Sequence, residues 1–169
     1  MKTTVLKYGS YGLLTGVALF LISILVTKNL EYSSQEILGY VTMVATLSFI
    51  FFGIKHYRDK VNNGVVSFGK ALTIGLLISA LVGVGVAIAD YFYTTVINPD
   101  FAQDYLDKTI EIYETQYSGA ELEAKKTEIT QQMKDYGSSG FMAALMFVTV
   151  VVIGFIISLI SGLILQRKN

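Results

Sequence analysis

Residues 141–165 read FMAALMFVTVVVIGFIISLISGLIL, and this stretch decides the fold of the chain. It lies within 31 consecutive residues, between Asp135 and Arg167, that include no Asp, Glu, Lys or Arg. A helix rises about 1.5 Å per residue, so roughly 20 apolar residues span a bilayer core about 30 Å thick. A core helix of a soluble protein would show a polar face at helical period, and this stretch does not. It therefore predicts a transmembrane helix.

Three further stretches, 8–27, 37–54 and 71–89, carry no charged residue over 18 to 20 positions. The composition agrees, because 15% of the 169 residues are charged, against roughly 25% in soluble domains. The sequence predicts an all-α polytopic membrane protein that forms a single domain over residues 1–169. The four predicted spans cover residues 8–26, 37–54, 71–96 and 141–165.

The first span has a competing interpretation as a cleaved signal peptide, because Lys2 and Lys7 precede its apolar run. That run continues to Val26, which is longer than the roughly 7–15 apolar residues of a signal peptide. Residues 27–32, TKNLEY, contain no small-x-small cleavage site. We therefore expect the segment to be retained as a transmembrane helix.

The distribution of basic residues predicts the orientation of the spans. The N-terminal segment, the connection between spans two and three and the C-terminal tail are basic, whereas the first loop has only Lys28 beside Glu31 and Glu36. These three basic segments must share one side, which the positive-inside rule assigns to the cytoplasm. Both termini are therefore predicted to be cytoplasmic. The basic residues are Lys2, Lys7, Lys55, Arg58, Lys60, Lys70, Arg167 and Lys168.

The connection between spans three and four, residues 98–137, holds nine acidic residues and four lysines and is predicted to lie outside the cytoplasm. Asn98 can cap a helix whose first residue is Pro99. Ser118 and Glu121 have the spacing of a capping box that begins a second helix, and Gly137 can end it. The segment thus predicts a two-helix hairpin inserted in the membrane domain. The first helix repeats apolar residues at helical spacing: Phe101, Tyr105, Leu106, Ile110, Tyr113 and Tyr117.

Small residues recur every four positions in two spans, which favours close approach of helix backbones in a membrane. One interpretation is packing within the four-helix bundle, and the other is a homodimer seam along span three. The spacing is compatible with either, so a homo-oligomer stays open. The candidate packing residues are Ala71, Gly75, Ser79, Gly83 and Ala87 in span three, and Gly154, Ser158 and Gly162 in span four.

Asp90 is the acidic residue that lies inside an apolar run, and it is the candidate functional residue of the chain. An ionisable group at membrane depth suggests proton or cation binding. However, Tyr91, Phe92 and Tyr93 follow directly, which places Asp90 about one turn from the outer interface, where water or the insert can bond it. No second intramembrane acid or base is available for a relay. We favour a structural role and keep ion coupling as the alternative.

The sequence holds no complete catalytic set. It has no cysteine and one histidine, His56. Residues 64–71, GVVSFGKA, resemble a phosphate-binding loop, but Ala71 stands where that loop needs a Ser or Thr for magnesium. The net charge is zero, which gives no indication of nucleic-acid binding. We predict no catalytic, cofactor or metal residues, and the expected partner is the lipid bilayer.

Several segments together resemble a family of bacterial membrane proteins known as domain-of-unknown-function family 4199. They are Tyr57-Arg58-Asp59, the segment GVVSFG at 64–69, the turn NPDF at 98–101, the order of four spans and the acidic insert. The resemblance covers essentially the whole chain. It implies a fold and a location in the bacterial cytoplasmic membrane, and it transfers no catalytic residue because the family has no established activity.

The leading functional hypothesis is an uncharacterised, non-enzymatic envelope protein that acts through protein–protein contacts, made by the insert and a helix groove. The alternative is a small transporter or channel subunit that uses Asp90 and the glycine-lined third span.

Overall fold

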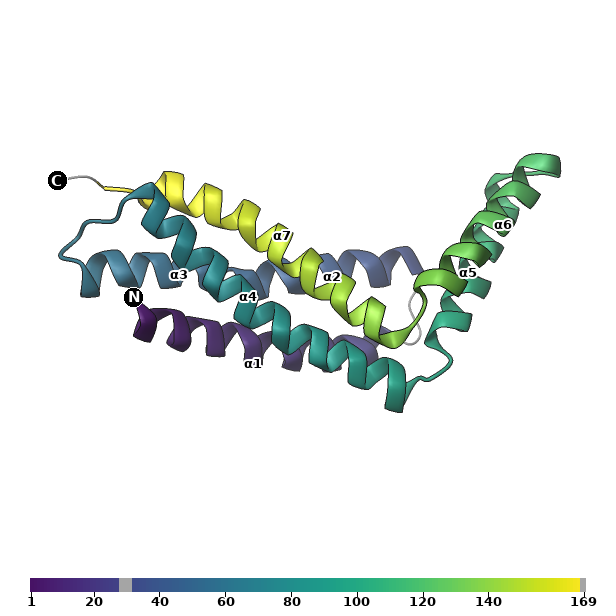
Figure 1. The fold of residues 1–169 in the computed structure, drawn as a ribbon, viewed down its shortest axis with the longest axis horizontal. Coiled ribbons are helices and arrows are strands. Elements are labelled where there is room, and N and C mark those ends of the chain that lie inside the picture. The colour runs from purple at the N-terminus through teal and green to yellow at the C-terminus, as the bar shows by residue number, and fades with distance from the viewer. Residues whose placement is uncertain (28–31, 168–169) are drawn as a thin grey trace. The chain divides into compact units, whose positions relative to one another are not determined.

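The computed structural model describes residues 1–27 and 32–167, which are almost entirely helical and include no β-strand (Figure 1). Lys28, Glu31 and Lys168, on which the predicted orientation partly rests, lie outside the described residues. The elements are α1 (Lys2–Thr27), α2 (Tyr32–Leu47), α3 (Phe49–His56), the π-helical turn η1 (Tyr57–Val61), α4 (Phe68–Phe92), the π-helical turn η2 (Tyr93–Ile97), α5 (Phe101–Gln116), α6 (Gly119–Tyr136) and α7 (Ser139–Leu165).

Four helical segments are long and apolar enough to cross a membrane, which confirms the predicted number of spans. They are Lys2–Ser23, Ile37–Val61, Phe68–Ile97 and Ser139–Leu165. The chain is therefore a multi-pass membrane protein. Large apolar side chains point outward along these segments, such as Leu14 and Ile164, which are 66% and 65% exposed. In a bilayer these side chains contact lipid tails rather than water.

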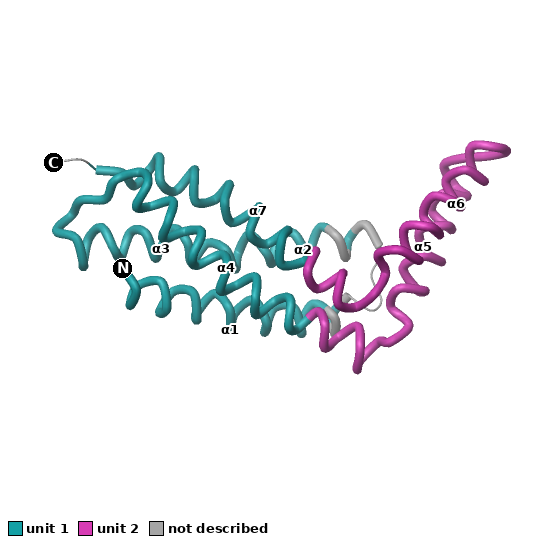
Figure 2. The backbone as a smooth tube through the Cα atoms, viewed as in Figure 1, with its two compact units in different colours: residues 1–89, 146–169 teal, residues 90–145 magenta. Residues whose placement is uncertain are grey.

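The chain divides into two compact units (Figure 2). The first comprises Met1–Ala89 and Met146–Asn169, and the second comprises Asp90–Leu145. In the first unit, the start of α1, the α3–α4 connection and the end of α7 lie together at one end of the bundle, which we call the terminal end (Figure 1).

Helix α4 is the central helix of the first unit. Half of its most apolar window is buried, against 22% to 28% in the other three spans. Its side chains Ile74 and Ile78 are completely buried, and Val82 is almost so. Helix α1 approaches it closely at Gly12, where an added Cβ would press against Val82. The core is thus organised around one helix that contacts its neighbours through small residues.

The sequence predicted one uninterrupted helix for the second span. The structure instead has an interruption at Ser48, between α2 and α3. The Ser48 hydroxyl donates to the carbonyl of Ala45 at 2.7 Å. Its backbone N–H is shared between the carbonyls of Val44 and Ala45, at 3.0 and 3.3 Å. A serine that bonds back to the preceding turn in this way distorts a helix locally. The apolar segment nevertheless continues through the interruption to Val61.

The second unit contains α5 and α6, and the predicted start of α5 was wrong. Helix α5 begins at Phe101, two residues after Pro99, with Asp100 as its N-cap. The Asn98 side-chain amide donates to Asp104 Oδ2 at 3.0 Å, and its backbone carbonyl accepts from the Phe101 N–H at 3.1 Å. Helix α6 begins after Ser118, where expected, but the Ser118 side chain forms no capping hydrogen bond.

Candidate functional site

The connection from η1 to α4 begins with a tight turn at Asn62–Val65. Val65 N–H donates to the Asn62 carbonyl at 3.0 Å, and the Asn62 side-chain amide donates to the Val65 carbonyl at 2.7 Å. The two central residues, Asn63 and Gly64, have φ values of 51° and 84°. Both lie in the left-handed region that an Asn-Gly pair tolerates best. The turn is therefore specified by its own sequence.

This turn leads into a backbone pairing with the C-terminal tail. Val66 N–H donates to the Arg167 carbonyl at 3.1 Å, and Arg167 N–H donates to the Val66 carbonyl at 2.9 Å. The guanidinium of Arg58 donates to the carbonyl of Leu165 at 3.3 Å, one of the last carbonyls of α7, which lack a partner within the helix. We call these four residues, Arg58, Val66, Leu165 and Arg167, the tail clasp. They close the terminal end of the bundle.

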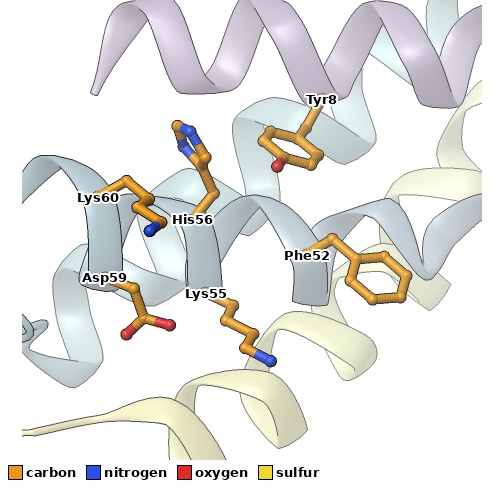
Figure 3. Close-up of a pocket in the computed structure, with 6 residues that line it drawn as sticks. All are labelled: Tyr8, Phe52, Lys55, His56, Asp59 and Lys60. Atoms are coloured by element: carbon orange, nitrogen blue, oxygen red, sulfur yellow. The ribbon is translucent and has the colours of Figure 1, made fainter.

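A hollow of about 210 Å³ lies at the terminal end, beside η1 (Figure 3). Figure 3 shows the rings of Tyr8 and His56 side by side, and their centroids are 5.3 Å apart. Helix α1 supplies Tyr8, while α3 and η1 supply the other lining residues. We call this site the basic hollow, and its lining residues are Tyr8, Phe52, Lys55, His56, Asp59 and Lys60.

The basic hollow carries a net positive charge. Lys55 and Lys60 are exposed, and the single carboxylate in the lining, Asp59, accepts hydrogen bonds from Arg58 on both oxygens, at 2.6 and 3.1 Å. Lys7 adds a further cation, 5.8 Å from the centroid of the Tyr8 ring. Because Arg58 offsets the charge of Asp59, the charge of the two lysines remains in excess in the lining.

The hollow has two unusual local features, a wide helical turn and a buried polar atom without a partner among the described residues. Asn62 N–H donates to the Tyr57 carbonyl, five residues back, at 2.9 Å, which closes the wide turn η1. Such single π-helical turns are frequent at functional sites. In addition, Nδ1 of His56 is buried and has no hydrogen-bond partner among the described residues. The imidazole therefore keeps an unused polar atom at this site.

The small residues of α4 and α7 lie against each other within this one chain. An added Cβ at Gly75 would overlap the Ser158 side chain, and one at Gly154 would overlap Ser79. Gly83 faces Phe147, and Gly162 faces Phe68 and Ala71. Ala87 is half-buried. The structure thus brings together seven of the eight candidate packing residues along the α4–α7 contact, the arrangement expected for packing within the bundle.

Asp90 lies on α4 and is 8% exposed. Its Oδ2 atom is buried and accepts no hydrogen bond from any described residue. The candidate span continues beyond it to Ile97, which is roughly 10 Å at about 1.5 Å per residue. Asp90 is therefore about two turns from the end of the candidate span. The missing hydrogen bond was not predictable from the sequence.

The segment after Asp90 is held by hydroxyl groups. Thr94 donates to the Asp90 carbonyl at 3.0 Å, and Thr95 donates to the Tyr91 carbonyl at 2.6 Å. Ser139 at the start of α7 donates to the Thr94 carbonyl at 3.3 Å. The carbonyls released by the wide turn η2 are thus partly satisfied inside the second unit.

Helices α5 and α6 form a pair with little buried surface. Lys126 of α6 and Glu114 of α5 form an ion pair at 2.6 Å, while Lys125 and Glu128 pair within α6 at 2.9 Å. Ile129 is buried, and no residue of α5 is. The hydrogen bond from Lys126 to Glu114 raises the pKa of the lysine. The pair is therefore joined partly by an exposed ion pair.

The described residues include no group of three or more His, Asp or Glu side chains arranged to hold a metal ion. Hydroxyls in the spans bond to the backbone of their own helix: Ser79 to the Leu76 carbonyl at 2.9 Å and Ser158 to the Gly154 carbonyl at 2.6 Å. This is the usual way for such groups to be satisfied in membrane helices.

Sequence reasoning missed the basic hollow and the tail clasp. The clustering of Lys55, Arg58 and Lys60 was used only to orient the spans, and the Asn63-Gly64 pair was not recognised as a turn signal. The pair predicts the local turn at Asn62–Val65, but no sequence signal predicts that Val66 pairs with Arg167 in a distant part of the chain. That the ring of Tyr8 meets His56 depends on the packing of α1 on α3, which the sequence alone does not specify.

Neither the curated proteins nor the solved structures include a match to this chain. The family model described as "Protein of unknown function (DUF4199)" matches residues 7–167. That range contains all four candidate spans almost completely, together with the tail clasp, the basic hollow and the α5–α6 pair. The chain belongs to the DUF4199 family of proteins of unknown function.

Proposed function

We propose that this chain is a non-enzymatic protein of the bacterial cytoplasmic membrane that acts through contacts of the α5–α6 pair with another envelope protein. Both termini are cytoplasmic in this proposal, and α5–α6 lies outside. The charge distribution supports that orientation, since eight lysines and arginines belong to the basic segments, whereas residues 98–137 hold nine acids against four lysines.

The observation that carries the proposal is the incomplete burial of the α5–α6 pair. Ile129 is the one residue of these two helices that is buried, while Phe101, Tyr105 and Tyr113 are half-buried. Two short helices that bury so little apolar surface are marginally stable by themselves. A further surface that covers the aromatic face would stabilise them, and aromatic side chains are enriched at protein interfaces.

The experiment compares the full chain with a variant in which residues 98–137 are replaced by a short Gly-Ser linker. Both are purified from native membranes under mild conditions, and their complexes are weighed intact. We expect a stoichiometric partner that is lost with the insert. An unchanged set of partners and an unchanged phenotype would argue against the proposal, provided that the shortened variant remains monodisperse.

A second candidate function, a small transporter or channel subunit, is favoured by Asp90. A buried carboxylate with an oxygen that lacks a partner among the described residues is costly, and in membrane proteins such groups mark proton or cation sites. The test is flux across vesicles that contain the purified protein, under imposed proton and cation gradients. Flux that is abolished in Asp90→Asn would support this function, and flux that the substitution leaves unchanged would remove Asp90 from it.

A further inference from the structure

We infer that the basic hollow binds the phosphate headgroup of an anionic phospholipid. The hollow lies beside η1, at the end of the candidate span Ile37–Val61, where a bilayer places its headgroups. This inference concerns the first unit and does not depend on the partner proposed for the α5–α6 pair.

The first argument is charge. Lys55 and Lys60 supply two ammonium groups to the lining, and both are exposed. The one acid beside them, Asp59, accepts hydrogen bonds from Arg58 at 2.6 Å and 3.1 Å, so Arg58 offsets its charge and the lysines remain in excess. Lysines clustered next to a membrane span attract anionic headgroups, and basic pockets between helices bind them.

The second argument is shape and polarity. At about 210 Å³ the hollow is smaller than the roughly 300–1,000 Å³ of a site that encloses a whole drug-sized molecule. It therefore suits a headgroup whose remaining atoms lie elsewhere. Phe52 lines the hollow and is 51% exposed, so it offers an apolar surface beside the cations. A molecule with a phosphate at one end and hydrocarbon at the other matches both properties, whereas a soluble anion uses only the lysines.

The third argument is an unused polar atom. Figure 3 shows the imidazole of His56 between the ring of Tyr8 and the side chain of Lys60. Nδ1 of this ring is buried without a hydrogen-bond partner among the described residues. Buried polar atoms in native proteins are nearly always paired, with a ligand or ordered water where no protein group is available. Rotation of the ring, which would bring this buried atom to the surface of the hollow, would let it donate an N–H to a phosphate oxygen.

Other cations at the terminal end attract anionic lipids without forming a site, so the test must separate the hollow from its surroundings. Lys2 and Lys70 belong to the basic segments but do not line the hollow, and both are exposed. The double variant Lys2→Gln/Lys70→Gln therefore removes the same charge as Lys55→Gln/Lys60→Gln. It serves as the matched control.

The experiment uses the purified full chain in a neutral detergent, titrated with phosphatidylglycerol or with phosphatidylcholine of the same acyl chains. Native mass spectrometry counts the bound lipids and gives the dissociation constants. We expect one tight phosphatidylglycerol that Lys55→Gln/Lys60→Gln weakens about 25-fold, from roughly fivefold for each lysine near an anionic lipid. The control variant should lose threefold at most, and Lys55→Arg/Lys60→Arg should retain binding, which shows that the fold persists.

Three outcomes would overturn the inference. Equal losses in the two Gln variants would mean that the cations act as a diffuse basic surface. Equal affinity for phosphatidylglycerol and phosphatidylcholine would mean that the headgroup charge is not recognised. Displacement of the lipid by inorganic phosphate at equal concentration would mean that the hollow is a site for soluble anions, since the acyl chains then contribute nothing.

Discussion

The side chain of Ser158 on α7 occupies the space in which any residue other than glycine at position 75 of α4 would place its Cβ. Ser158 is completely buried, and its hydroxyl donates to the Gly154 carbonyl at 2.6 Å. The reciprocal contact, Gly154 against Ser79, lies one helical turn away. On each helix a glycine thus accommodates the serine side chain of the other, and such close approach at small residues is how membrane helices associate in the absence of a hydrophobic driving force.

This contact predicts that Gly75→Ala destabilises the bundle. Overpacking a tight contact costs about 1–3 kcal/mol. The matched control is Gly69→Ala on the same helix, because a Cβ there meets nothing within 4 Å. Removing a helical glycine at an open position stabilises a protein by roughly 0.4–1 kcal/mol. Thermal unfolding in detergent should therefore show a lower midpoint for Gly75→Ala and an equal or higher one for Gly69→Ala.

The partner residue makes this prediction specific. In the double variant Gly75→Ala/Ser158→Gly the clashing side chain is gone, and more than half of the lost stability should return. If the double variant instead loses as much stability as the sum of the two single changes, the Ser158 side chain is not what prevents a larger residue at position 75.

The tail clasp predicts that Arg58 controls the order of the C-terminal tail. The Arg58→Gln substitution removes the guanidinium, which in the unmodified chain donates to the Leu165 carbonyl at 3.3 Å and pairs with Asp59. The Arg167 N–H, which donates to the Val66 carbonyl at 2.9 Å, should then exchange with solvent faster. Hydrogen exchange of residues 163–167 measures this. Lys60→Gln, two positions on, is the control, and exchange that rises equally in both variants would contradict the proposed cap.

The burial of Asp90 predicts that its substitution changes the stability of the fold, whichever of the two proposed functions is correct. Asp90 Oδ2 is buried without a hydrogen-bond partner among the described residues, which makes ionisation of this group costly, so Asp90→Asn, which cannot ionise and keeps the shape, should stabilise the fold by about 1 kcal/mol or more. The exposed Asp100→Asn is the control and should change stability by less than about 0.5 kcal/mol. A clear loss of stability in Asp90→Asn would contradict this prediction and indicate that a donor or a bound cation stabilises the carboxylate.

The ion pair between α5 and α6 predicts a pH dependence. The hydrogen bond to Glu114 raises the pKa of Lys126 above its ordinary value of 10.5. A raised pKa in the folded state means that the pair is fully stabilising below about pH 10.5 and loses this contribution as the pH rises through the folded value. The α5–α6 contact should therefore loosen only in strongly alkaline solution.

The measurement uses the absence of native cysteine. Spin labels on Thr115→Cys and Thr130→Cys report the distance between the two helices. The distribution of distances should broaden above about pH 10.5, and in a Lys126→Gln background it should already be broad at neutral pH. Because that background keeps every tyrosine, a pH effect that persists in it unchanged would assign the loosening to tyrosine ionisation instead.

The sequence was sufficient for the fold class because the property that defines it, long uncharged stretches, is local. The four spans and the start of α6 at Ser118 follow from such local signals. The break at Ser48 and the start of α5 at Phe101 did not follow from local signals, because each depends on which of several competing hydrogen bonds forms. The basic hollow depends on the position of Tyr8 against α3, a tertiary contact for which sequence spacing contains no signal.

The last prediction concerns orientation, on which the proposed function depends. Single cysteines at Ser118 and at Ser67 are both exposed in the folded chain and lie outside the candidate spans, and neither position has positive φ, whereas Asn63, with φ 51°, would be strained by the substitution. In intact cells a membrane-impermeant maleimide should label Ser118→Cys and leave Ser67→Cys unlabelled, and permeabilised cells should allow both to react. Those results would place α5–α6 outside and the basic hollow in the inner leaflet, where anionic lipids attract lysines. The reverse pattern would place the acidic pair in the cytoplasm, and the search for an envelope partner would then give way to one for a cytoplasmic protein.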